Sequence, residues 1–111
     1  MTPAQAIAAL DRQIAQHGQG VQLRAAAADP DAASATVRAF VRGYRPEELG
    51  GGVQQGDTLM ILSPTHLAVA SIETIERGDG VTVADRARYV EVANPVVLND
   101  VVVRIECTVR G

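Results

Sequence analysis

Lysine and tryptophan are absent from this chain of 111 residues, and cysteine occurs once, at Cys107. Without lysine, the chain has no Schiff-base residue, no lysine general base and no phosphate-loop lysine. A single cysteine excludes an internal disulfide framework and a metal cluster built from cysteines. These absences remove several classes of enzyme and metalloprotein from consideration.

Aromatic residues are also scarce, at 3% of the chain. We therefore predict a core of Val, Ile, Leu and Ala in which Phe40, Tyr44 and Tyr89 are the only rings. Proteins that stack nucleobases or bind proline-rich peptides use several exposed aromatic side chains, and three are few for either function.

No apolar run approaches the roughly 20 residues that a membrane-spanning helix needs. The N-terminus lacks the basic start and apolar centre of a signal peptide, so we expect a soluble intracellular protein with no membrane partner. The formal net charge of −3 argues against a general nucleic-acid binder. The length fits a single domain spanning residues 1–111.

The first segment has the signature of a helix, which we predict over residues 2–17. Thr2 is suited to the N-cap, Pro3 to the first helical turn and Gln5 to a capping box, while Gly18 fits a left-handed C-terminal stop. The apolar stripe of this helix consists of Ile7, Leu10 and Ile14.

The remainder, residues 20–111, alternates apolar and polar residues in short runs, most clearly over 101–109. Residues 93–95 should break the chain at Pro95, and residues 69–75 fit either an edge strand or an irregular excursion. We predict a mostly β protein: a small barrel or sandwich of six to seven short antiparallel strands, with one N-terminal α-helix. The expected strands are residues 21–24, 36–42, 58–63, 81–83, 88–92, 96–98 and 101–109.

Candidate catalytic groups do not form a recognisable pattern. His17 and His66 lack ligands at metal-binding spacing, and Ser63 lacks the Gly-x-Ser-x-Gly elbow of a hydrolase. The turn aspartates are expected to bond their own backbone; they are Asp57, Asp79, Asp85 and Asp100. We predict no catalytic residue, metal site or cofactor, and hence a protein that is not an enzyme.

Residues 43–56, the glycine-rich loop, form the strongest functional candidate. They contain one proline, five glycines and the acidic pair Glu47–Glu48, without any periodicity. Gly50–Gly52 do not belong to a phosphate loop, because no Lys-Ser/Thr follows. A loop this long is either disordered or functional, and a functional one could gain order on assembly.

Several short motifs in this order resemble the head–tail joining proteins of long-tailed phages, also called head-closure or stopper proteins, which occur too in phage-like gene transfer particles. The motifs are VRGYRPEEL at 41–49, GDT at 56–58, ILSP at 61–64, RGD at 77–79, RARYV at 86–90 and VRG at 109–111. The chain departs from the family pattern at Ala84–Arg86, where a glycine is usual, and at 65–76, which is less proline-rich.

The resemblance implies a β-barrel subunit of a dodecameric homo-oligomeric ring at the head–tail interface of a virion or phage-like particle. Such a ring lies below the portal and adaptor, docks the tail and its terminator, and retains packaged double-stranded DNA without reading its sequence. The glycine-rich loop would face the channel, where Glu47 and Glu48 would repel DNA phosphates. The implied channel or interface residues are Arg42, Tyr44, Arg45, Glu47, Glu48, Gly50, Gly51, Gly52, Gln54 and Gln55.

Two other functions remain open at this stage. A tail-terminator ring protein would differ from a stopper in forming hexamers. A stand-alone binding module of SH3 or OB type would need a concave face with exposed aromatic residues.

Overall fold

The computed structural model describes residues 1–25 and 34–111. In the sequence, alanines around Asp29, Pro30 and Asp31 indicate a loop at 25–34, and most of that segment lies outside the described residues. Helix α1 spans Pro3–His17. The predicted capping box is confirmed: the Gln5 N–H donates to Thr2 Oγ1 at 3.1 Å, and the Thr2 N–H donates to Gln5 Oε1 at 2.9 Å. The start of this helix is therefore encoded locally.

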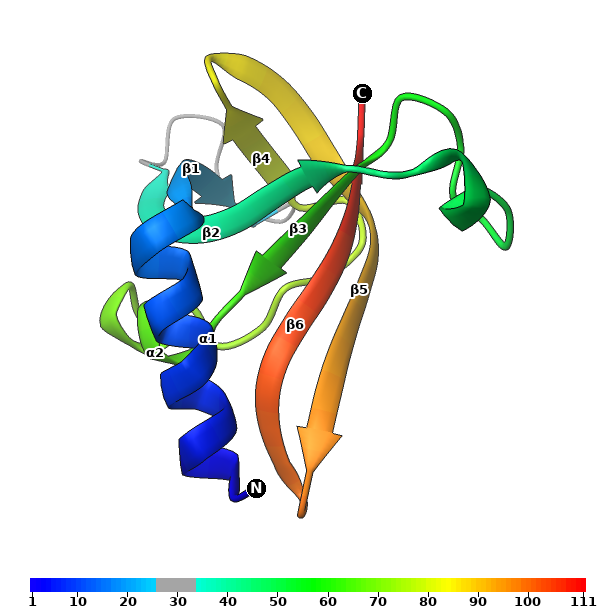
Figure 1. The fold of residues 1–111 in the computed structure, drawn as a ribbon. Coiled ribbons are helices and arrows are strands. Elements are labelled where there is room, and N and C mark those ends of the chain that lie inside the picture. Colours follow the sequence, from blue (N-terminus) through cyan, green and yellow to red (C-terminus); the bar gives the residue numbers. More distant parts are fainter. Residues whose placement is uncertain (26–33) are drawn as a thin grey trace.

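Six antiparallel strands close into a barrel in the order β1-β2-β3-β6-β5-β4 (Figure 1). This confirms the predicted mostly β class and selects a barrel over a sandwich. The strands are β1 (Gln19–Arg24), β2 (Ala35–Gly43), β3 (Thr58–Leu62), β4 (Gly80–Val83), β5 (Arg86–Leu98) and β6 (Val101–Arg110).

The predicted break at residues 93–95 is wrong, because β5 runs through Pro95, which is in register with Ile105 of β6. Strand β4 pairs with β5 only as far as Tyr89, so Pro95 lies where β5 has no second strand partner among the described residues. Proline is tolerated at such an edge because no ladder hydrogen bond is lost there. Two register shifts, at Val90/Val92 and Val96/Val97, bend the long strand.

Of the two alternatives predicted for residues 69–75, the structure shows the irregular segment and not the edge strand. Helix α2 spans Pro64–Val69, and an irregular segment follows it as far as β4. The Ser63 hydroxyl caps α2 by accepting the Thr65 N–H at 3.2 Å, and it donates to Asp11 of α1. The two helices are thus tied together at the cap of α2.

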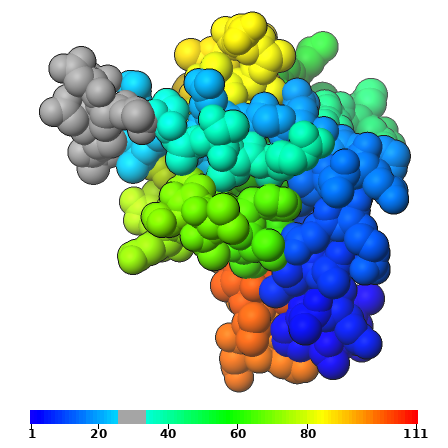
Figure 2. Space-filling model, turned by 90° about the vertical axis from the view of Figure 1, so that its left-hand side faces the viewer, coloured from blue at the N-terminus to red at the C-terminus, as the bar shows by residue number. Residues whose placement is uncertain are grey.

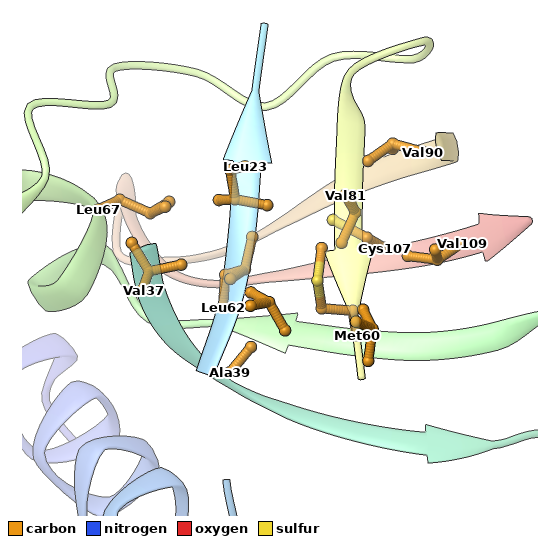
Figure 3. Close-up of a cluster of buried hydrophobic side chains, with 12 residues drawn as sticks. Leu23, Val37, Ala39, Met60, Leu62, Leu67, Val81, Val90, Cys107 and Val109 are labelled. Atoms are coloured by element: carbon orange, nitrogen blue, oxygen red, sulfur yellow. The ribbon is translucent and has the colours of Figure 1, made fainter. Parts of the chain in front are cut away.

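The barrel interior is filled by aliphatic and sulfur-containing side chains (Figure 3). Val21, Met60, Val90, Cys107 and Val109 are almost completely buried there. None of the three aromatic rings belongs to this cluster; of the rings predicted for the core, Phe40 packs instead on the smaller core described next. A barrel of this size leaves room for Val, Leu and Met side chains.

Helix α1 packs on the outside of the barrel and creates a second, smaller core. Leu10 and Ile14 contact Ile61, with Phe40 and Leu59 beside them. The helix ends at Gly18, but its φ of −83° is not the left-handed conformation expected there.

The molecule has projections at two ends (Figure 1). The glycine-rich loop extends from one end, beside the C-terminus. At the other end the β5–β6 hairpin continues past the barrel alongside the start of α1; residues 94–104 are called the arm. No helix within the described residues is long and apolar enough to cross a membrane.

Candidate interface loop and groove

The glycine-rich loop is fixed at its entry by a bidentate ion pair. Arg42 donates from its two terminal nitrogens to the two carboxylate oxygens of Glu48, at 2.8 and 2.9 Å. Glu48 also accepts the Arg45 N–H at 2.9 Å and so closes the one-turn helix η1 (Pro46–Glu48). These bonds, first that from Arg42 and then that from Arg45, lower the pKa of Glu48 to about 2.

The middle of the loop is a minimal hairpin. Gly50 and Val53 exchange two backbone hydrogen bonds of 3.0 Å. Gly51 and Gly52, between them, have φ values of 58° and 96°. Positive φ at both central positions favours glycine, so this turn gives the glycine run a conformational role.

The loop is fixed at its exit by two arginines from other strands. Arg110 of β6 donates to both carboxylate oxygens of Asp57 at 2.9 Å and to the Gly52 carbonyl at 2.8 Å. Arg88 of β5 donates to the Gly56 carbonyl at 2.8 Å. The Asp57 side chain is buried, and its hydrogen bonds with Arg110 lower its pKa. Burial lowers the pKa of Arg88.

A groove of about 630 Å³ separates the loop from the outer face of the barrel; it is called the loop groove. Six of the ten residues predicted from the sequence line it, and they are Arg42, Tyr44, Arg45, Glu48, Gly51 and Gly52. Glu47, Gly50, Gln54 and Gln55 are not part of its lining. The loop groove therefore brings together the base of the loop and its glycine turn. Glu47 lies outside the groove and is exposed on η1.

The loop groove has an apolar floor and a charged rim. Phe40, Leu59 and Val92 contribute to the floor. Tyr44 shares a 2.8 Å hydrogen bond with Thr108. The rim carries the Arg42–Glu48 pair and a second pair, Arg104–Glu106 at 3.4 Å. Such a surface suits contact with another protein, where an apolar centre is surrounded by polar groups.

Two features limit the chemistry available to the described residues. The thiol of Cys107 is buried, and this burial raises its pKa to about 12, which keeps it protonated and unreactive. Within residues 1–25 and 34–111, no cluster of three or more His, Cys, Asp or Glu side chains is placed to hold a metal ion.

The residues that sequence reasoning missed are the anchors at the loop exit. The sequence predicts Asp57 only as a turn aspartate. It does accept the Gln54 N–H at 2.8 Å, but it also binds Arg110, 53 positions away. Arg88 and Arg110 are not among the predicted loop residues, because their bonds to the loop join segments that are far apart in the sequence and meet only in the closed barrel.

No protein-family model fits this sequence, and no curated protein matches it significantly.

Proposed function

We propose that this protein is a structural head–tail connector of a tailed phage or phage-like particle, a stopper ring subunit that helps to close the DNA channel. The observation that carries the proposal is a loop projecting from a closed barrel yet held at both ends by arginines. The arginine anchors fix the direction in which the loop projects, while the glycines of its central hairpin allow the backbone there to change conformation. The motif resemblance supports the same assignment.

In this role Glu47 supplies the charge toward DNA. Glu48 is neutralised by Arg42, whereas Glu47 is exposed and makes no ion pair with any described residue. A single carboxylate repeated around a ring would line the channel with negative charge and keep phosphates from adhering. Packaged DNA would pass without sequence-specific contacts.

Electron microscopy of particles from a strain that lacks this gene tests the proposal. Unjoined heads and tails, with DNA lost from the heads, would support it. Complete particles would contradict it. A terminator would instead give a hexameric ring in the particle, whereas a stopper gives a dodecameric one.

Substitution of Glu47 tests the channel role separately. Glu47→Lys should reduce DNA retention or delivery several-fold, because it turns a repulsive position into one that binds phosphate. Asp100→Lys, the same charge change at the tip of the arm, should leave both unchanged. Glu48→Lys is unsuitable for this purpose, since it would break the anchor with Arg42. Full retention and delivery with Glu47→Lys would contradict the channel role.

A binding module is the second candidate, and the loop groove is the observation that favours it. Phe40 and Tyr44 line this groove, so two of the three rings border one concave surface. Retention of this protein in purified particles, measured by mass spectrometry, would support the connector; absence from particles would favour the module.

A further inference from the structure

The arm is a two-stranded ribbon without a further strand on either side. Strand β3 pairs with β6 only as far as Ile105, and β4 pairs with β5 only as far as Tyr89, so within the described residues the two strands of the arm pair only with each other. Figure 2 shows the arm, in orange, projecting below α2, in green, and beside α1, in blue. Within the arm only Val103 is buried. Because a ribbon of two strands is marginally stable in water, any surface that covers the arm would stabilise it.

One face of the arm is apolar and exposed. Val97 and Val102 lie opposite each other in the two strands, so their side chains share a face, and they are 56% and 37% exposed. Pro95 and Ile105 form the neighbouring pair on the same face. These side chains form a contiguous apolar patch, and such patches mark contact surfaces more often than single exposed valines do.

The apolar face continues into a groove of about 370 Å³, which is called the arm groove. Pro95, Val102 and Ile105 form one wall of it. The opposite wall comes from α2 and the segment that follows this helix, and its apolar residues are Pro64, Leu67, Ala68, Ile72 and Ile75. Glu73 and Thr74 are the remaining residues of the lining.

Glu73 decides the charge of the arm groove. It is exposed, it is the only charged residue among the described residues of the lining, and it forms no ion pair with a described residue. A groove with a carboxylate and no cation repels DNA phosphates and anionic lipids. A protein segment that offers apolar side chains together with a lysine or arginine complements it. The formal net charge of −3 makes a second copy of this chain a poorer source of that cation than a basic partner.

We propose that the arm groove holds an apolar segment of a different protein, and that a lysine or arginine of this segment faces Glu73. The apolar side chains of the segment would cover Val97 and Val102 and enter the groove between the arm and α2. The contact does not use Asp100, which lies at the turn of the arm and outside the groove lining.

The position of the arm separates this contact from the proposed channel. Figure 1 shows the arm at the end of the molecule opposite to the glycine-rich loop. One end of the subunit would therefore hold a neighbouring protein while the other faces DNA. The inference rests on the proposed connector function, because it takes the partner to be another component of the same particle.

A photoreactive side chain identifies what covers the arm. Particles are assembled with p-benzoylphenylalanine in place of Val97 and irradiated, and the cross-linked peptides are sequenced by mass spectrometry. We expect a covalent product with a different particle protein, through a segment in which apolar residues adjoin a lysine or arginine. The same photoreactive residue in place of Tyr89, which is 40% exposed and outside the groove lining, should not capture this segment.

Charge reversal tests the role of Glu73. Glu73→Arg should lower the cross-link yield from position 97 about two- to fivefold, the range expected for loss of an exposed ion pair. Asp85→Arg is the matched control, because Asp85 is exposed at the β4–β5 turn and also lacks an ion pair with a described residue. It should leave the yield unchanged. Replacing the basic residue of the partner with glutamate should restore the yield in the Glu73→Arg protein.

The outcomes separate the contact from the function. A product with a different particle protein, in a yield that depends on the charge at position 73, supports the docking. Protein that is present in particles but gives no product, a product only with a second copy, or a yield that Glu73→Arg does not change overturns the docking and leaves the connector function standing. Protein absent from the particles overturns both.

Discussion

Arginine side chains determine where the glycine-rich loop lies. Arg42 holds its entry through Glu48, while Arg88 and Arg110 hold its exit through backbone carbonyls and Asp57. Two of these arginines bind a carboxylate with both ends of the guanidinium fork, a geometry that lysine cannot reproduce. The chain has no lysine, and its structure uses the arginine fork at both anchors of the loop.

The Glu48 anchor predicts a pH dependence. Its pKa falls from an ordinary value of 4.5 to about 2, so its contribution to stability is complete above pH 4.5 and disappears as the pH falls toward 2. Glu48→Gln should therefore be less stable than the natural protein at pH 7, and the difference should shrink between pH 4.5 and pH 2. Urea unfolding at a series of pH values measures this difference.

Glu47→Gln is the control for that experiment, because it removes a neighbouring carboxylate that has no ion-pair partner among the described residues. It should follow the natural protein at each pH. If the free energies of unfolding of Glu48→Gln and the natural protein differed by the same amount at every pH between 4.5 and 2, the predicted role of the Glu48 anchor would be contradicted.

Close backbone contacts, one within α1 and one with β2, explain Gly18 at the end of α1. A Cβ added there would lie 2.5 Å from the Ile14 carbonyl oxygen and 2.8 Å from that of Ala39 in β2. Both obstacles are backbone atoms, which cannot rotate away. Glycine is therefore favoured both by the last turn of α1 and by the approach of the helix end to β2, and the contact with β2 does not follow from a capping rule.

Gly18→Ala should accordingly lower the free energy of unfolding by about 1–3 kcal/mol, the usual cost of overpacking. Gly20→Ala is the matched control, since an added Cβ there meets nothing within 4 Å. It should change stability by less than about 0.5 kcal/mol. Chemical denaturation of both variants measures these changes in the free energy of unfolding. Equal changes for the two variants would mean that α1 can shift away from β2 to make room for the added Cβ.

Element boundaries were predictable where a local signal dominates. The cap of α1, the alternation of β6 and the turn at Asn99–Asp100, with φ values of 50° and 64°, all agree with the structure. Pro95 misled the prediction because its effect depends on whether its strand has a neighbour on that side, which the sequence does not reveal.

At the scale of the whole molecule, β6 closes the barrel. It pairs with β3 on one side and β5 on the other, and it buries Cys107 and Val109 completely. A chain that ends at Val103 would leave two open edges and an unfilled core. Each lost core side chain costs about 1.5–3 kcal/mol against a total stability of roughly 5–15 kcal/mol.

We therefore expect the chain truncated after Val103 to show no cooperative thermal transition in circular dichroism. A chain that lacks only Gly111, which is exposed, should unfold like the full protein. Cooperative unfolding of the shorter chain would mean that the remaining strands fold without closure.

The sequence by itself determined the secondary structure class, the capped helix, most strands and the position of the glycine-rich loop, because caps, turns and alternation act over a few residues. Only the tertiary structure decided that Glu48 is neutralised while Glu47 is exposed, and that Asp57 meets Arg110. Those pairings depend on strand order and register, which bring together side chains that no local pattern connects.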